Sequence, residues 1–129
     1  MVERLSILLV EDNLLNQRIV TFSLKKYNHE VTIANNGVEA IEKFRENKYD
    51  VILMDIMMPV MDGLEATVKI REIESNGNFE NRTPIIALTA NTMDNDRDKC
   101  ISYGMDEFMA KPFDIEKLKS IFSELNIPS

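Results

Sequence analysis

The chain alternates short, almost continuously apolar runs with longer amphipathic segments, and this alternation restricts the possible folds more than any other feature. Three of the apolar runs cover residues 5–10, 50–55 and 84–89. Runs of this length without a polar face are typical of strands that are buried on both sides of a sheet. They predict the inner strands of a parallel sheet with helices on both faces.

Two other segments carry weaker strand signals. Residues 29–34 alternate in polarity, with Val31 and Ile33 on one face, which predicts an edge strand that begins beside a surface turn at His29. Residues 107–110 predict a fifth, short strand.

The segments between these strands carry helical spacing. Leu15, Ile19 and Phe22 stand at i, i+4 and i+7, so we expect them to form the buried stripe of a first helix, widened by Val20, Leu24 and Tyr27. Similar spacing predicts helices after Gly37, after Gly63 and over residues 115–125, the last with Asp114 as its N-cap. Residues 93–103 are mostly polar and predict a weakly anchored helix.

Five strands alternating with five helices predict an α/β fold with a doubly wound parallel sheet. The length of 129 residues fits one domain, residues 1–129, with a core over about 5–125. In such sheets, ligands bind outside the carboxyl ends of the strands. The residues at these ends are therefore the candidates for a functional site.

Composition excludes several classes of function. The formal net charge of −7 argues against a nucleic-acid-binding surface. The apolar runs are about six residues long, whereas a membrane helix needs ~20. The N-terminus lacks the organisation of a signal peptide, so we expect a cytoplasmic protein without direct membrane contact. Cys100 is the only cysteine, which excludes an internal disulfide and a zinc site of several cysteines.

Polar side chains with complementary chemistry stand at four of the predicted strand ends. The first strand ends in Glu11-Asp12, the third in Asp55 and the fourth in Thr89, and Lys111 follows the fifth. Carboxylates brought together in this way repel one another unless a cation lies between them. Oxygen ligands favour Mg²⁺, with Mn²⁺ as an expected substitute.

The remaining groups at this edge indicate phosphoryl chemistry. The Lys111 ammonium supplies a second positive charge, and the Thr89 hydroxyl can donate to a phosphoryl oxygen. With Mg²⁺ beside them, these groups predict phosphoryl transfer in which an aspartate is the nucleophile.

The same residues belong to longer motifs. These are Glu11-Asp12-Asn13, the N-G-x-E-A motif at residues 36–40, the D-x-x-M-P-x-M-D-G motif at residues 55–63, Leu88-Thr89-Ala90, residues 104–108, and Lys111-Pro112-Phe113. Through these motifs the chain resembles the receiver domains of two-component response regulators. The resemblance runs from about Leu5 to Leu125, without a departure at a position that the chemistry needs.

The resemblance implies a fold and a site. The fold would be flavodoxin-like, with strand order 2-1-3-4-5. Asp55 would be the phosphorylated aspartate, and Glu11, Asp12, Asp55 and the backbone carbonyl of Met57 would bind Mg²⁺. The chain would act as a signalling phosphoacceptor that promotes only its own phosphorylation and dephosphorylation.

The resemblance also implies a switch. Thr89 and Lys111 would contact the phosphoryl group, Phe108 would be the switch aromatic, and the Lys111–Pro112 bond would be cis. The responding surface would consist of residues 93–103, the fifth strand and the last helix.

In a finer respect the chain is similar to receivers of hybrid histidine kinases, through residues 87–91, 96–100 and 104–106. The expected partner is a histidine kinase or a histidine phosphotransfer domain, and phosphorylation-dependent dimerisation remains open. We expect no output domain after Leu125, and the chain could be a stand-alone relay or a fragment of a longer kinase.

Three alternatives stay open at this point. A phosphatase of the haloacid dehalogenase type needs a second acid two residues after the nucleophile, where this chain has Met57. A flavodoxin-like cofactor binder needs a phosphate-binding loop where Glu11-Asp12-Asn13 would repel phosphate. A receiver fold that no longer accepts phosphate would not need the complete set of acids together with Thr89 and Lys111.

Overall fold

The computed structural model describes residues 4–56, 61–77, 82–89, 94–111 and 113–127, without the side chains of residues 94–97. The strands are β1 (Ser6–Val10), β2 (Glu30–Ala34), β3 (Val51–Asp55), β4 (Ile85–Thr89) and β5 (Glu107–Ala110). The helices are α1 (Leu14–Lys25), α2 (Gly37–Glu46), α3 (Gly63–Asn76), α4 (Asp94–Ser102) and α5 (Ile115–Glu124). The predicted alternation of strands and helices is confirmed.

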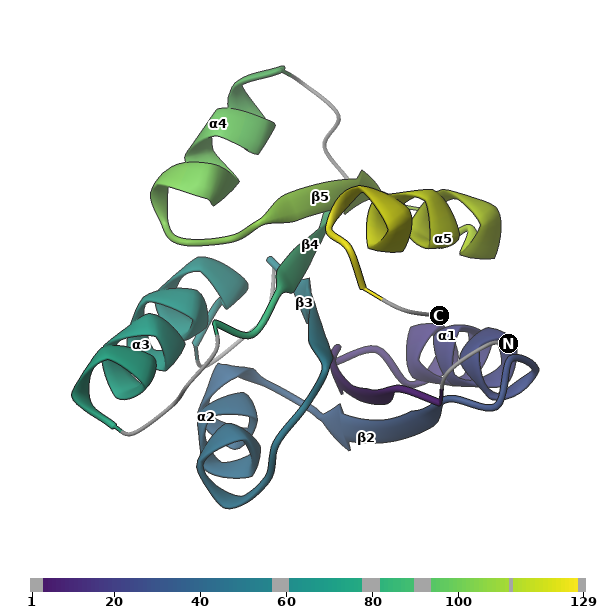
Figure 1. Cartoon of the computed structure of the whole chain (residues 1–129), viewed down its shortest axis with the longest axis horizontal. Helices are drawn as coiled ribbons and strands as arrows, with labels where there is room; N and C mark the ends of the chain where they lie inside the picture. The colour runs from purple at the N-terminus through teal and green to yellow at the C-terminus, as the bar shows by residue number, and fades with distance from the viewer. Residues whose placement is uncertain (1–3, 57–60, 78–81, 90–93, 112, 128–129) are drawn as a thin grey trace.

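All neighbouring strands pair in parallel, in the order β2-β1-β3-β4-β5. The expected flavodoxin-like topology is therefore confirmed. Figure 1 shows α1 and α5 on one face of this sheet and α2 and α3 on the other, with α4 on the same side as α3. Because every strand runs in the same direction, all carboxyl ends lie along one edge of the sheet.

The inner strands are buried on both faces, as their apolar runs predicted. Leu8 and Val10 of β1 pack into a cluster beneath α2, α3 and α4, whereas Ile7 and Leu9 pack beneath α1 and α5. Every residue of β3 and β4 is buried. Complete burial of one such aliphatic side chain contributes about 1.5–3 kcal/mol, so the two clusters hold the strand ends in place.

Side-chain caps begin four of the helices close to the carboxyl edge of the sheet. Asn13, Asn36 and Asp62 each accept a hydrogen bond from a backbone N–H in the first turn of α1, α2 and α3. Asp114 does the same for α5, as predicted. In α4, Cys100 is buried, whereas Ile101 is 40% exposed.

The predicted buried stripe of α1 is confirmed for Val20 and Leu24 and wrong for its other three helical positions. Leu15, Ile19 and Phe22 are 66%, 47% and 61% exposed. The helix has apolar residues on two faces, and helical spacing alone does not reveal which face meets the sheet. The face that packs against the sheet carries Gln17, Val20 and Leu24.

His29 is not at the surface, contrary to the prediction from its turn position. It is only 5% exposed, and its Nδ1 accepts a hydrogen bond of 3.1 Å from the Leu5 backbone N–H. Its ring packs edge-on against the Phe122 ring, with the two ring centroids 6.5 Å apart. The preceding Asn28 has a φ of 66°, a left-handed conformation that turns the chain back toward the core.

Among the described residues, the longest helix has 14 residues, and none combines the length and apolar character that crossing a bilayer requires.

Candidate functional site

Three carboxylates from two adjacent strands meet at the carboxyl edge of the sheet. Glu11, Asp12 and Asp55 each offer an oxygen, and these oxygens lie within 4.8 Å of one another. Their proximity follows from the β1–β3 register, which pairs Val10 with Met54 and so places the following residues side by side. Glu11 and Asp55 are buried, whereas Asp12 is exposed.

Close backbone packing holds Asp55 in this position. The Ile56 N–H donates to the Leu88 carbonyl at 3.2 Å, and the Gly63 N–H donates to the Ile56 carbonyl at 3.0 Å. A Cβ on Gly63 would collide with the Asp55 carbonyl oxygen. Glycine at position 63 therefore allows α3 to begin directly against the strand end that carries Asp55.

Lys111, the residue directly after β5, reaches the carboxylates. Its Nζ lies 3.2 Å from Asp55 Oδ2 and 3.5 Å from Glu11 Oε1. Its backbone N–H donates to the Thr89 carbonyl at 2.7 Å, which ties the end of β5 to the end of β4. Burial alone would lower the pKa of Lys111, but the charges and hydrogen bonds of Asp55 and Glu11 outweigh it and raise that pKa.

The pKa of Glu11 is raised mainly because its carboxylate is buried. Burial, reinforced by the neighbouring Asp55 carboxylate, raises the pKa of Glu11 to about 7, although the Asn13 N–H and Lys111 act in the opposite direction. One ammonium thus offsets the combined cost of burial and repulsion only in part. A divalent cation with a preference for oxygen ligands would remove the remaining penalty, so the donor set fits Mg²⁺.

Thr89 and Phe108, the two residues of the predicted switch, lie in β4 and β5. Thr89 is the last residue of β4 and is 5% exposed. In the β3–β4 register Asp55 pairs with Leu88, the residue directly before Thr89. Phe108 is half-buried in β5, in register with Ala87, and packs against the cluster beneath α2, α3 and α4. Met57 and Pro112, with the predicted carbonyl ligand and the predicted cis bond, lie outside the described residues.

A chain of amides behind Glu11 was not predicted from the sequence. Gln17 Nε2 donates to the Glu11 carbonyl at 2.6 Å and to Asn35 Oδ1 at 2.8 Å. Asn35 in turn donates to Glu39 Oε1 from both its backbone N–H and its Nδ2, each at 3.0 Å. The sequence did contain a signal for this chain of amides. Gln17, Val20 and Leu24 stand at i, i+3 and i+7, so Gln17 is a polar residue on an otherwise apolar helical face.

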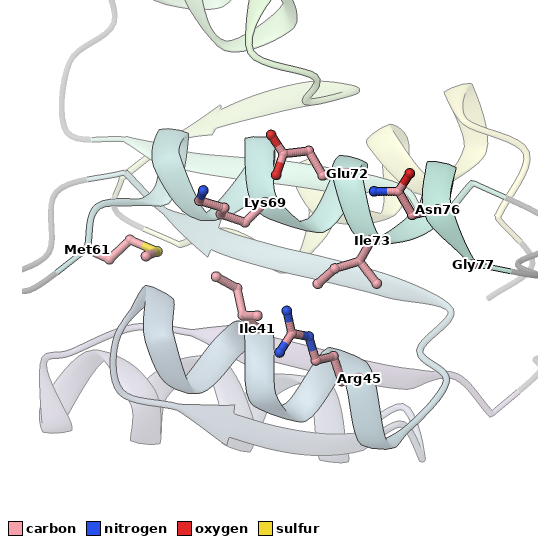
Figure 2. A pocket seen from close by; sticks show the side chains of 8 residues that line it. All are labelled: Ile41, Arg45, Met61, Lys69, Glu72, Ile73, Asn76 and Gly77. Atoms are coloured by element: carbon pink, nitrogen blue, oxygen red, sulfur yellow. The ribbon is translucent and has the colours of Figure 1, made fainter.

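A cavity and a groove lie near this part of the molecule, and the lining of the cavity includes Glu11. A cavity of about 100 Å³ lies between α1 and the end of β5, and its lining includes Glu11, Ile19 and Lys111. A groove of about 480 Å³ lies between α2 and α3, where Ile41 faces Ile73 and Arg45 points toward α3 (Figure 2). None of the three carboxylates lines the groove.

Known proteins match both the sequence and the geometry. A family model described as the response regulator receiver domain matches residues 7–123. Histidine kinase 5 of Arabidopsis thaliana is 40% identical over 140 residues, which cover 92% of this chain and 15% of that protein. The chain thus spans only a small part of this relative.

Two solved structures share the fold over nearly the whole chain. The receiver domain of sensor histidine kinase PA1611 from Pseudomonas aeruginosa, with a magnesium ion in its active-site cleft, is 41% identical with a TM-score of 0.80, covering 95% of this chain and 97% of that one. A Saccharomyces cerevisiae structure pairs the phosphotransfer protein Ypd1 with the receiver domain of Ssk1. The match is 31% identical, with a TM-score of 0.88, and covers 96% of this chain and 90% of that one. Because the family model matches residues 7–123 and solved receiver domains share the fold, the chain belongs to the family of response regulator receiver domains.

Proposed function

We propose that this chain accepts a phosphoryl group from a phosphohistidine onto Asp55, in a Mg²⁺-dependent reaction of two-component signalling. The observation that carries the proposal is the buried Asp55 carboxylate, which Lys111 approaches to 3.2 Å within the cluster of Glu11 and Asp12. Buried carboxylates beside a lysine and a hydroxyl have the composition of a phosphoryl-transfer site.

In the proposed step, a carboxylate oxygen of Asp55 attacks the phosphorus in line with the P–N bond of the donor. The new O–P bond forms an acyl phosphate, while the P–N bond breaks and its electron pair returns to the imidazole nitrogen. Lys111 donates hydrogen bonds to the phosphoryl oxygens as their charge is redistributed. Water later hydrolyses the acyl phosphate, and we propose no turnover of other substrates.

Glu11, Asp12 and Asp55 would hold the Mg²⁺ ion, with the Met57 carbonyl as a further ligand by family resemblance. When bound, the cation offsets negative charge on the phosphoryl oxygens and the carboxylates. Mn²⁺ is expected to substitute because it also favours oxygen ligands. The raised pKa of Glu11 supports this assignment, since a nearby cation would relieve the cost of its charge.

We propose that phosphorylation changes the surface formed by α4, β5 and α5. The added phosphoryl oxygens are strong acceptors. The Thr89 hydroxyl would donate to one of them, and Phe108 would then turn further into the core. The position of Thr89 between the strands of Asp55 and Lys111 supports this route. A phosphorylation-dependent dimer is one candidate outcome at that surface.

An exposed apolar face on α1 supports a protein as the phosphodonor. It consists of Leu14, Leu15, Ile19 and Phe22, which are 60%, 66%, 47% and 61% exposed. The helix begins directly after the acidic pair, so a partner on this face could present a histidine to Asp55. The Ssk1 receiver is seen with a histidine phosphotransfer protein, and we propose such a protein or a histidine kinase as partner.

The net charge of −7 speaks against nucleic acid as a direct partner. We also propose that the chain works in the cytoplasm without contacting a membrane directly.

The test is the intact mass of the chain after incubation with acetyl phosphate, with and without Mg²⁺. We expect a Mg²⁺-dependent gain of one phosphoryl mass in the wild type and none in Asp55→Asn. Asp62→Asn, in the same connection between β3 and α3, should still gain it, because asparagine also caps helices.

A phosphorylated histidine phosphotransfer protein serves as the second donor, since a receiver can ignore small donors. Equal labelling of Asp55→Asn and the wild type would rule out Asp55 as the acceptor. No labelling of the wild type by either donor would favour a receiver fold that acts only as an interaction module.

A further inference from the structure

Gln17 is a polar side chain on the face of α1 that packs against the sheet. It is 6% exposed and shares that face with Val20 and Leu24. A buried amide without hydrogen bonds costs about 1–3 kcal/mol, so its partners are informative. Both hydrogen bonds of its Nε2 go to acceptors next to the acidic cluster, namely the Glu11 carbonyl and Asn35 Oδ1.

The neighbours of Gln17 determine the orientation of its amide. Asn35 Nδ2 donates to Glu39 Oε1 at 3.0 Å, so Oδ1 of Asn35 is the atom that faces Gln17. The Asn35 backbone N–H donates to the same Glu39 oxygen at 3.0 Å. The Glu39 carboxylate accepts only, and the hydrogen bonds from Asn35 lower its pKa, so it remains an acceptor at neutral pH. Each amide in this chain of donors has one satisfactory orientation.

This chain of hydrogen bonds ends at the peptide that joins Glu11 to Asp12. Gln17 Nε2 donates to the carbonyl of this peptide at 2.6 Å, and in the preceding peptide the Glu11 N–H donates to the Ala34 carbonyl at 3.0 Å. The Asn13 N–H donates to Glu11 Oε2 at 3.1 Å. Within the described part of the chain, no hydrogen bond or ion pair holds the exposed Asp12 carboxylate, so its location depends on the backbone.

We infer that Gln17 is a positioning residue of the cation site: its bond to the Glu11 carbonyl orients the Glu11–Asp12 peptide so that both carboxylates face Asp55, and Asn35 and Glu39 orient Gln17. The inference rests on the proposed function, because it assumes that these carboxylates bind a divalent cation. Loss of a hydrogen-bond partner behind a metal ligand commonly weakens metal binding by about 10–100-fold. Here one backbone contact is lost, and the lower end of that range applies.

The experiment is a Mg²⁺ titration of the whole chain, followed by calorimetry or amide chemical shifts, with urea unfolding measured in parallel. Gln17→Met preserves most of the side-chain volume and removes both donated bonds. We expect its Mg²⁺ dissociation constant to rise about tenfold. Leu24→Val is the matched control, since it also removes buried contacts from the same helix face and should leave the dissociation constant within about twofold of the wild type.

A second variant tests the chain of amides without disturbing the core. Asn35 is exposed, and Asn35→Ala removes the side-chain oxygen that accepts the second hydrogen bond of Gln17. We expect Mg²⁺ binding to weaken by about threefold. In the Gln17→Met background the same change should have no further effect, because the two residues act in one network. Asn47→Ala, an exposed asparagine at the end of α2, should leave binding unchanged.

The outcomes separate this inference from the proposed function. Failure of the wild type to bind Mg²⁺ would contradict the proposed cation site itself. A wild type that binds, with Gln17→Met and Asn35→Ala within twofold of it, would overturn only the positioning role. An equal loss in Leu24→Val would also overturn that role, because reduced stability would then explain the effect. If Gln17→Met does not fold, Asn35→Ala against Asn47→Ala decides the question.

Discussion

Lys111 Nζ lies 3.2 Å from Asp55 Oδ2, although the two residues are 56 positions apart in sequence and β4 lies between their strands. The lysine side chain crosses the carboxyl end of β4, where Thr89 is located. Parallel strands bring this carboxylate, hydroxyl and ammonium to one edge of the sheet.

This contact predicts a specific loss of phosphorylation rate. Lys111→Met removes the donor that would stabilise charge on the transferring group, and we expect the rate with acetyl phosphate to fall about 100-fold. The rate is measured as the initial gain of phosphoryl mass. Lys117→Met changes an exposed lysine of α5 and should leave the rate unchanged. A rate in Lys111→Met close to that of the wild type would exclude lysine from the transfer step.

The carboxylate cluster predicts a gain of stability from Glu11→Gln when no divalent cation is present. The pKa of Glu11 in the folded chain is about 7, above its ordinary value of 4.5. The folded state therefore holds this proton more tightly than the unfolded state, and the wild type loses stability as pH rises from about 4.5 to 7.

At pH 8 in a chelator, Glu11→Gln should therefore unfold with a free energy about 2 kcal/mol higher than that of the wild type, with little difference at pH 4. Saturating Mg²⁺ should reverse the order, because only the wild type keeps its full set of carboxylates. Urea unfolding measures these differences, and Glu42→Gln, at an exposed position on α2, is the control. A variant less stable than the wild type in chelator would contradict the raised pKa of Glu11.

His29 predicts a loss of stability in mild acid. Burial lowers the pKa of His29 below its ordinary value of 6.5, although the Asp50 charge acts in the opposite direction. The unfolded state then binds the proton more tightly, so stability falls as pH decreases below about 6.5. Protonation of Nδ1 also removes the acceptor for the Leu5 N–H.

The chain contains one histidine, so imidazole chemical shifts report this pKa directly. His29→Gln does not titrate and should show a smaller slope of unfolding free energy between pH 5 and 6.5. Equal slopes in the two proteins, or an imidazole pKa above the ordinary value, would refute the buried neutral histidine.

The exposed face of α1 predicts a partner-specific defect. Phe22→Ser removes the ring beneath the Lys26 ammonium, which lies 4.6 Å from the ring centroid, and we expect transfer from a phosphoprotein donor to slow about tenfold. Labelling by acetyl phosphate should not change, because the site is intact. Stability should remain within about 0.5 kcal/mol, since Phe22 is exposed.

Val38→Ser is the matched control for this face, since Val38 is an exposed apolar residue of α2. The measurement is the rate of phosphoryl labelling of each variant, in parallel reactions with the phosphoprotein donor and with acetyl phosphate. Equal slowing with acetyl phosphate would attribute the effect of Phe22→Ser to the site rather than to docking.

Much of this protein followed from the local sequence. The apolar runs at residues 50–55 and 84–89 predicted β3 and β4, because a strand buried on both faces needs apolar residues at every position. Helical spacing and Asp114 likewise predicted α5 and its cap. Because parallel strands share a carboxyl edge, the positions of Glu11, Asp55 and Lys111 were enough to expect them together.

The remaining features depended on contacts between distant segments. Two faces of α1 satisfy helical periodicity, and only its packing against the sheet decided that Gln17, rather than Leu15 or Ile19, is buried. His29 is buried because the chain turns at Asn28 and meets Phe122 from α5. Periodicity records the distribution of apolar residues around one element, whereas burial depends on which neighbour covers it. The sequence alone therefore determined the elements and the acidic site, and tertiary packing decided which helix face stayed exposed and which amides support Glu11.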